Sequence, residues 1–454
     1  MKKTLTLLAL TAISYIGYTQ NAEACTENIS LLATSVKAKD GAAYDYLTTL
    51  RKDCPSFHKG IYNYGEFAIK QRIDAAKDNA EKEKYVADLL KLYEEFFKYF
   101  PNDGAGVDMK KGLALFSYAP EKKVEIYNYF DNAFKSDNAN FSSTRGLYAY
   151  FEIFVNDYKA GAKGITLQQV FDKYDDISEK LAELEKVDSE AKDILIAKEE
   201  AGTQLDSKEA KRKAKLEENL ENITIVTSSM DAIIIELSSC DKLIPFYQKG
   251  FEENKNNEVW LKRAADRLES KECDTDPLFS KISEALYKLN PSADAAYKLG
   301  VVEMQKKNTA KAMSYFEQAA NLYTDNTKKA TVYMKIASTY MNSNKSQARA
   351  YARKALQVKP SYGRAYLLIA QLYGNSINDC GTKPFDKRAM YWLAAQYADK
   401  AAAADSSLKE TASKMASGYR AAAPSRTEIF NEGMSGKRIA FECWVGESVV
   451  VPTL

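Results

Sequence analysis

The residues that most often carry out catalysis are sparse in this sequence. His58 is the one histidine among 454 residues, so neither a His-based catalytic triad nor an HExxH metal site can be assembled. Two close acid pairs are candidates for a carboxylate-based hydrolase, Asp175 with Asp176 and Asp274 with Asp276. The first pair lies in a charged helical stretch and the second in a turn before a proline. We therefore expect no enzyme activity, no cofactor and no metal site.

The cysteines indicate structural chemistry instead. The chain has six of them, an even number, and no CxxC motif or Cys/His cluster, which argues against a zinc site or a thiol oxidoreductase. Structural disulfides in an exported protein are the expected use of such cysteines. Many pairings are possible, and the simplest joins sequence neighbours: Cys25 with Cys54, Cys240 with Cys273, and Cys380 with Cys443.

The N-terminus predicts export. Residues 1–19 contain two lysines and then a short apolar run, Leu5–Tyr18, as in a secretory signal peptide. Cleavage can fall after residue 19 or extend to residue 24, which would leave Cys25 first and raise the alternative of a lipid anchor there. No other stretch approaches the ~18 apolar residues of a membrane helix. The expected location is periplasmic or associated with the outer membrane.

Composition favours a helical, non-nucleic-acid-binding protein. The 64 basic residues nearly balance the 62 acidic ones, so the chain has no overall field to hold nucleic acid or anionic lipid. Only 10 prolines and 20 glycines occur, too few for a loop-rich β protein. The elements that position any functional residue are therefore expected to be helices.

A repeated helical hairpin organises residues 291–407, with a period of about 34 residues. Small residues recur where two helices would cross, together with a large residue that fills the groove between them. In the first unit these are Leu299, Gly300, Ala312, Phe316 and Ala319; in the second Ile336, Ala337, Tyr340, Ala348, Ala352 and Ala355; in the third Tyr366, Ile369, Ala370, Tyr373, Ala394, Ala398 and Ala401. The spacing resembles that of tetratricopeptide repeats.

The rest of the chain divides by the same criteria. We expect degenerate helical repeats at 20–165, a long charged helical hairpin at 166–225, a helical repeat pair at 226–290, and a C-terminal helix with a β-hairpin at 408–454. The charged hairpin begins with the capping-box sequence Thr-Leu-Gln-Gln and carries balanced, interleaved charges. Such a pattern is typical of a solvated hairpin, with a partner-binding arm as the alternative.

Two β-rich runs close the chain, Arg438–Trp444 and Ser448–Val451, with Gly446 between them as a permissive turn residue. Strand alternation puts Phe441 and Cys443 on one face and leaves Trp444 on the other, where it would be partly exposed. A lone hairpin is marginally stable in water, so it must pack on the repeats. A disulfide to the inserted loop of the third repeat would fix it there.

The segments AAAADSS (401–407), PSRTEIFNEG (424–433) and CWVGESVVV (443–451) add a resemblance to secreted tetratricopeptide-repeat proteins of the Bacteroidota. This resemblance implies a periplasmic scaffold beside outer-membrane assembly, type IX secretion or gliding machinery. It transfers no functional residue, because the shared pattern consists of packing positions.

We therefore expect an all-α, tetratricopeptide-like α-solenoid that acts as a non-catalytic scaffold or adaptor. Its partners would be envelope proteins or extended peptides, bound in the groove of residues 291–407. The candidate contact residues are Lys298, Glu303, Tyr340, Tyr373 and Trp444. We expect no nucleic-acid partner and no transmembrane span, and membrane association only through a protein partner or a lipid on Cys25. The alternative function is a glycan- or peptidoglycan-binding envelope module that uses exposed aromatic residues.

Overall fold

The computed structural model describes residues 22–161 and 164–454, and the predicted signal peptide at residues 1–19 lies outside them. Helices make up most of the described chain, and a small antiparallel sheet of two strands lies near its C-terminus. The predicted fold class, an all-α solenoid with a charged hairpin and a small β-hairpin, is confirmed. The chain divides into two compact units, Met1–Ile177 and Ser178–Leu454, and the division falls within helix α8 (Leu167–Glu200).

Unit 1 is a series of helical hairpins in which each helix from α2 to α7 contacts the next. Besides a first helix at 22–38, its elements are α2 (Ala43–Asp53), α3 (Gly60–Asp74), α4 (Asn79–Tyr99), α5 (Val107–Tyr118), α6 (Lys123–Ser136), the 3-10 turn η1 (Asn138–Asn140) and α7 (Thr144–Lys159). The predicted Cys25–Cys54 disulfide is present and ties the first helix to the end of α2. Asp78 caps α4 by accepting the backbone N–H of Glu81 at 2.8 Å.

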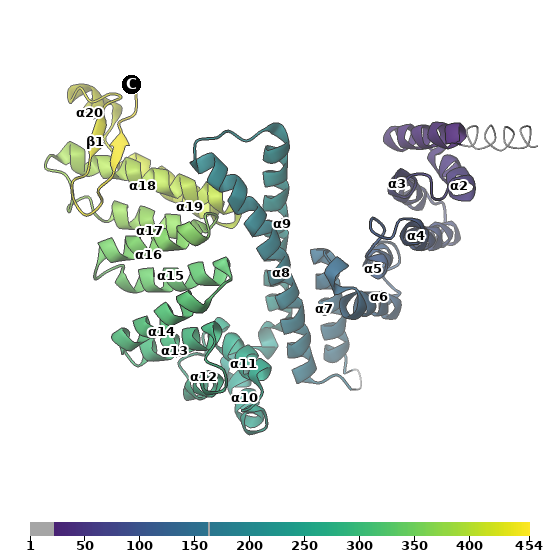
Figure 1. Cartoon of the computed structure of the whole chain (residues 1–454), viewed down its shortest axis with the longest axis horizontal. Helices are drawn as coiled ribbons and strands as arrows, with labels where there is room; N and C mark the ends of the chain where they lie inside the picture. Colours follow the sequence, from purple (N-terminus) through teal and green to yellow (C-terminus); the bar gives the residue numbers. More distant parts are fainter. Residues whose placement is uncertain (1–21, 162–163) are drawn as a thin grey trace, which may run out of the picture. The chain divides into compact units, whose positions relative to one another are not determined.

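Unit 2 contains the repeats and the chain's C-terminal end (Figure 1). Its elements after α8 are α9 (Ser207–Ile234), η2 (Ile235–Leu237), α10 (Cys240–Asn254), α11 (Glu258–Ser270), α12 (Pro277–Leu289), α13 (Ala293–Gln305), α14 (Thr309–Leu322), α15 (Asn326–Tyr340), α16 (Lys345–Val358), α17 (Gly363–Gly374), α18 (Pro384–Ala404), η3 (Ser406–Leu408), α19 (Lys409–Ala422), α20 (Arg426–Asn431), β1 (Arg438–Ala440) and β2 (Ser448–Val450). The Cys240–Cys273 disulfide, also as predicted, joins the start of α10 to the turn after α11.

Small residues lie where the two helices of a repeat cross. A Cβ placed on Gly300 of α13 would meet the ring of Phe316 of α14 at 2.4 Å, and that ring is completely buried. In the next repeat, Ala348, Ala352 and Ala355 of α16 are also completely buried. The sequence spacing therefore sets the close approach of the paired helices.

Polar bonds join successive repeats at their ends. The Tyr323 hydroxyl donates to Oδ1 of Asp294 at 2.7 Å, and the Lys328 ammonium of α15 lies 3.0 Å from the same oxygen. Burial by itself would raise the pKa of Asp294, but the tyrosine hydrogen bond and the Lys328 charge hold it below its ordinary value. The Asp294 carboxylate thus stabilises the folded repeats in its ionised form.

The charged hairpin is built from α8 and α9 and extends to Ile234. The capping box at its start is present: Thr166 and Gln169 each accept a hydrogen bond from the other's backbone N–H, at 3.3 and 2.8 Å. We call the part that belongs to unit 2, residues 178–234, the arm. Figure 1 shows α9 and the adjacent half of α8 running past the ends of the repeat helices that lie near residues 404–408.

Ion pairs across the tip of the arm hold its two helices together. Nζ of Lys198 on α8 lies 2.6 Å from Glu209 on α9, and Nζ of Lys213 on α9 lies 2.6 Å from Glu199 on α8. Asp206 and Glu209 form a second capping box at the start of α9. The interleaved charges therefore bridge the hairpin as well as facing solvent.

The β-hairpin is shorter than the sequence predicts. Arg438, Ile439 and Ala440 pair with Val450, Val449 and Ser448, and residues 441–447 form the connection. Trp444 therefore lies in a turn rather than on a strand, because the chain leaves the ladder at Phe441 to reach the α17–α18 loop. The C-terminal segment, residues 424–454, buries several apolar side chains in the core of the last repeats; these are Ile429, Ile439, Phe441, Val445, Val449 and Val451.

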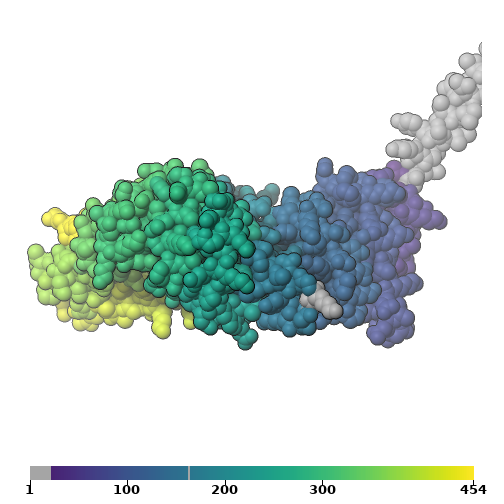
Figure 2. All heavy atoms as spheres, turned by 90° about the horizontal axis from the view of Figure 1, so that it is seen from below, coloured from purple at the N-terminus to yellow at the C-terminus, as the bar shows by residue number. Residues whose placement is uncertain are grey.

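Figure 2 shows the repeat helices of unit 2 from below, where their side chains form a continuous surface. Within the described residues, no single helix is long and apolar enough to cross a membrane, although the bent pair Ser207–Leu237 with Cys240–Asn254 meets that test jointly, with a bend of 77°.

Candidate partner-binding site

Lys298 is buried between two helices rather than exposed in a groove. Its side chain is 6% exposed, and its Nζ lies 2.6 Å from Asp266 and also pairs with Glu269. Burial by itself would lower the pKa of Lys298, but these two carboxylates raise it above its ordinary value. In this structure Lys298 joins α11 to α13 and offers a partner little surface.

Glu303 is likewise buried, at 7% exposure. Its carboxylate accepts hydrogen bonds from Asn308 at 3.0 Å and Lys311 at 3.2 Å, both at the start of α14. The expectation that Lys298 and Glu303 line an open groove therefore differs from the structure. Each side chain pairs with oppositely charged or polar groups of a neighbouring helix and fixes the repeat geometry.

Tyr340 lies at the crossing of α15 and α16. Its half-buried ring stacks on Tyr351, with the ring centroids 6.1 Å apart and the planes 11° apart. The Tyr351 hydroxyl in turn donates to Glu317 of the preceding repeat at 2.9 Å. Tyr340 thus has part of its surface open while contributing to helix packing.

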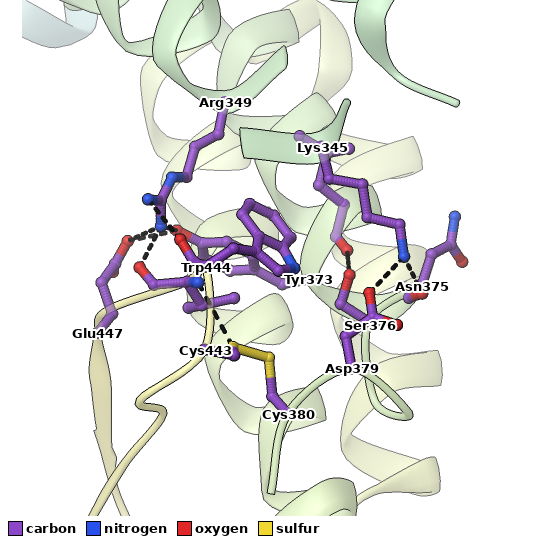
Figure 3. Close-up of a disulfide and its surroundings, with 12 residues drawn as sticks. Lys345, Arg349, Tyr373, Asn375, Ser376, Asp379, Cys380, Cys443, Trp444 and Glu447 are labelled. Carbon is purple, nitrogen blue, oxygen red and sulfur yellow. Dashed lines mark hydrogen bonds and ion pairs between the residues drawn. A yellow bond between two sulfur atoms is a disulfide. The ribbon is translucent and has the colours of Figure 1, made fainter. Parts of the chain in front are cut away.

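Tyr373 and Trp444 lie together in the C-terminal segment's contact with the repeats (Figure 3). Their ring centroids are 5.8 Å apart, and the Arg349 guanidinium lies 5.1 Å from the Trp444 ring centroid. Arg349 also donates to the carbonyl oxygens of Trp444, at 2.8 Å, and Val445. Two of the five sequence-predicted contact residues therefore meet, and this chain's own residues already cover much of both.

Glu447 completes this contact and was not singled out by the sequence. Its carboxylate pairs with Arg353 and accepts hydrogen bonds from the hydroxyls of Tyr373 and Tyr397, the latter at 3.0 Å. Burial, followed by the Glu447 carboxylate, raises the pKa of Tyr373. We call this group the Glu447 clasp. The only sequence signal for it is a lone acid beside a turn glycine, which does not identify distant partners.

A disulfide fastens the same contact to the α17–α18 loop. Cys380 and Cys443 are bonded, as predicted, across 63 residues of sequence (Figure 3). Lys345 of α16 braces the loop by donating to the Asn375 carbonyl at 2.9 Å and to Asp379 at 2.7 Å. The Lys345 hydrogen bond lowers the pKa of Asp379. The C-terminal segment is therefore a fixed cap on this surface.

A polar cavity lies where the arm meets the repeats. Its volume is about 320 Å³, and the arm contributes Ser189, Lys192 and Thr224 while the repeats contribute Thr331, Lys359 and Arg364. The sequence predicted the groove and the charged hairpin as separate binding elements. The structure brings residues of both to the walls of one cavity, which we call the seam cavity.

Long-range polar bonds hold the arm against the repeats around this cavity. Lys192 donates to the Ala404 carbonyl at 2.7 Å, and Asp193 accepts the backbone N–H of Ser361 at 2.7 Å. Tyr366 donates to Glu200 near the arm's tip. These polar contacts attach the arm to the repeats at three points.

Two further cavities adjoin the seam cavity. One of about 580 Å³ lies beside Ala404, Tyr366 and Lys400, and one of about 630 Å³ lies beside Ser407 and Ser413. Both share lining residues with the seam cavity. A line of three cavities thus follows the contact between the arm and the repeats.

Two further sequence candidates, His58 and Asp276, have structural roles. His58 is exposed, and its Nδ1 accepts the backbone N–H of Gly60 at 3.0 Å. Asp276 caps α12 by accepting the backbone N–H of Leu278 at 2.8 Å. Within the part of the chain that the structure describes, no group of three or more His, Cys, Asp or Glu side chains is arranged to hold a metal ion.

Comparisons with known proteins give only distant similarities. No protein-family model and no curated protein matches the chain. Among solved structures, a human IFIT1 dimer with PPP-AAAA is 14% identical over 84% of this chain and 94% of that chain, with a TM-score of 0.30. Yeast Tom70 is 10% identical over 87% of this chain and 96% of that chain, with a TM-score of 0.26. At these values, the fold assignment rests on the chain's own helical hairpins.

Proposed function

We propose that the protein is a non-catalytic scaffold that binds a protein partner or an extended peptide along the seam between the arm and the repeats. The observation that carries the proposal is the line of three cavities between close-packed repeats and a charged arm held by polar bonds. Hydroxyls, carboxylates and ammonium groups of both elements face this space, which suits a polar main chain better than an apolar ligand.

We also place this function in the periplasm or at the outer membrane, beside outer-membrane assembly, type IX secretion or gliding machinery. The three disulfides support an oxidising compartment, and the N-terminal sequence supports export. Blocking of thiols before and after reduction, in fractionated cells, tests the compartment. Six free thiols in a cytosolic fraction would contradict it.

Site-specific photocrosslinking tests the proposed surface. A photoreactive phenylalanine analogue at Thr331, which is exposed and lines the seam cavity, should crosslink one discrete protein in intact cells. The matched control places the same analogue at Lys249, an exposed position on α10 away from the seam. Equal crosslinking at both positions, or none at Thr331, would count against the seam as the binding surface.

The alternative, a glycan- or peptidoglycan-binding module, relies on exposed aromatic residues. Tyr373 is completely buried, and Trp444 is covered on one side by Arg349 and Tyr373. These aromatic residues already serve internal contacts, so the polar seam supports a protein or peptide ligand better.

A further inference from the structure

Lys359 differs from the other buried lysines of the described chain. Five lysines there have less than 9% of their surface exposed, and four have a carboxylate within 4.0 Å of the ammonium; these are Lys111, Lys180, Lys192 and Lys298. Lys359 is 7% exposed and has no such carboxylate among the described residues. Its ammonium donates to the hydroxyl of Ser189 and, at 2.9 Å, to that of Thr327.

A buried ammonium without a carboxylate at ion-pair distance is costly, because two neutral hydroxyls replace only part of its hydration. An ammonium has three N–H donors, and the hydroxyls account for two of them. The side chain lines the seam cavity, whose volume of about 320 Å³ is at the lower end of ligand-binding pockets. The site therefore has both the charge and the space for a small anionic group.

Other positive groups face the same cavity. Arg364 is exposed at its edge, and no carboxylate within the described residues lies within ion-pair distance of its side chain. Gly363, also in the lining, is the first residue of α17, a helix of 12 residues whose N-terminus adds partial positive charge. Lys192 lies on the arm side, where Glu217 balances it at 3.4 Å.

The neighbouring acids limit the charge of the ligand. Asp193 interacts electrostatically with Lys359, but its carboxylate is bonded to the backbone N–H of Ser361, and burial raises its pKa. Glu185 and Glu221 are exposed lining residues, and Asp405 caps η3 by accepting the N–H of Ser407 at 3.0 Å. These carboxylates would repel a dianion such as phosphate more than a group with one negative charge.

We propose that the seam cavity binds a single carboxylate, which pairs with Lys359 and Arg364 and so joins the arm to the repeats. The carboxylate can come from a free small acid or from a partner's chain. This inference deepens the proposed function, since it names the chemistry by which a partner segment would be anchored.

Calorimetric titration of the full mature chain tests the proposal with defined probes. These are acetate, a six-residue Gly-Ser peptide with an acetylated N-terminus and a free C-terminus, the same peptide with an amidated C-terminus, and inorganic phosphate. Both carboxylate probes should bind, and the amidated peptide should bind at least tenfold more weakly than the free-acid peptide. A peptide affinity at least tenfold above that of acetate identifies a partner chain as the source, and similar affinities identify a small acid.

The variant Lys359→Met should weaken carboxylate binding at least tenfold, whereas Lys335→Met, at an exposed position on α15, should leave it unchanged. Because Lys359→Met removes a buried charge that lacks an ion pair, we expect its thermal unfolding midpoint to stay the same or rise. If that variant fails to fold, Arg364→Gln at the exposed edge tests the same ion pair and should also weaken binding.

Equal binding of the free and amidated peptides, tighter binding of phosphate, or unchanged binding by the charge-removing variant would overturn the proposal. The crosslinking experiment at Thr331 reports separately on the proposed function. If Thr331 crosslinks a partner but the calorimetry detects no carboxylate binding, only the proposed carboxylate site is rejected. If carboxylates bind but no partner is crosslinked, the seam is rejected as the partner-binding surface and the carboxylate site stands.

Discussion

Replacing Gly300 with alanine tests the packing on which the repeat architecture depends. The new Cβ would lie 2.4, 2.5 and 3.0 Å from three ring carbons of Phe316. These separations are shorter than van der Waals contact, so either the ring or the helix must move. The Phe316 ring is completely buried and cannot move into solvent. The expected result is loss of stability through overpacking.

The magnitude follows from two opposed effects. Overpacking of a core typically costs about 1–3 kcal/mol, while alanine is favoured over glycine in a helix by about 1 kcal/mol. With a clash of this depth against a fixed ring, we expect a net loss of about 1–2 kcal/mol. Gly418→Ala provides the matched control, because a Cβ on Gly418 of α19 meets nothing within 4 Å. That variant should gain about 0.5–1 kcal/mol.

Urea unfolding followed by far-UV circular dichroism measures both variants, and a change in midpoint at constant slope reports stability. Hydrogen exchange of α13 and α14 shows whether the loss is local. Phe316→Leu in the Gly300→Ala background should recover part of the loss, since the smaller side chain leaves room for the new methyl group. The reasoning is refuted if Gly300→Ala is as stable as Gly418→Ala, or if the second substitution only adds to the loss.

Three further predictions concern other contacts. Replacing Cys380 and Cys443 with serine should lower the free energy of unfolding by at most about 4 kcal/mol, the loop-closure value for a 63-residue separation. It should also speed hydrogen exchange in β1 and β2 but not in α13. Unchanged exchange in β1 and β2 would contradict the idea that the disulfide fastens the C-terminal segment. Glu447→Gln should lower the free energy of unfolding by about 1–3 kcal/mol, because two arginines lose their carboxylate partner. The control Glu442→Gln, at an exposed position, should leave the urea midpoint unchanged. Equal effects of the two substitutions would refute the Glu447 clasp. The pKa of Asp294 in the folded state lies below its unfolded value of about 3.9. Its ionised carboxylate therefore stabilises the fold above that pH, and this stabilisation is lost as the pH falls through the lower folded pKa. In Asp294→Asn, the urea midpoints at pH 5 and pH 3 should therefore differ less than in the original chain.

The repeats could be predicted from sequence because their determinants are local. Gly300 and Phe316 are 16 residues apart, and the spacing of small residues on each helix records how closely its partner approaches. The neighbouring cysteine pairs follow the same logic, since Cys240 and Cys273 are separated by about one repeat. Helix starts such as that at Thr166 are equally local, because a capping box involves only four residues.

The candidate site was harder to predict because its partners are distant in sequence. Lys298 resembles an exposed lysine until Asp266 and Glu269 of another helix bury and pair it. Lys359 meets Ser189 across 170 residues, and no local pattern signals that contact. Side-chain exposure on a repeat depends on which other helices cover it, and hydrophobic periodicity along one helix does not record this.

The capped end of the repeats restricts how the array can grow. Because α19 and the C-terminal segment lie against α18 and bury the apolar side chains there, the face of α18 on which a further repeat would stack is already covered. Lengthening by duplication would instead have to occur upstream, within α13–α16, where each hairpin already presents a matching face to the next. The same contacts also cover this end of the repeats, through which a solenoid could otherwise stack head to tail on a second copy and form filaments.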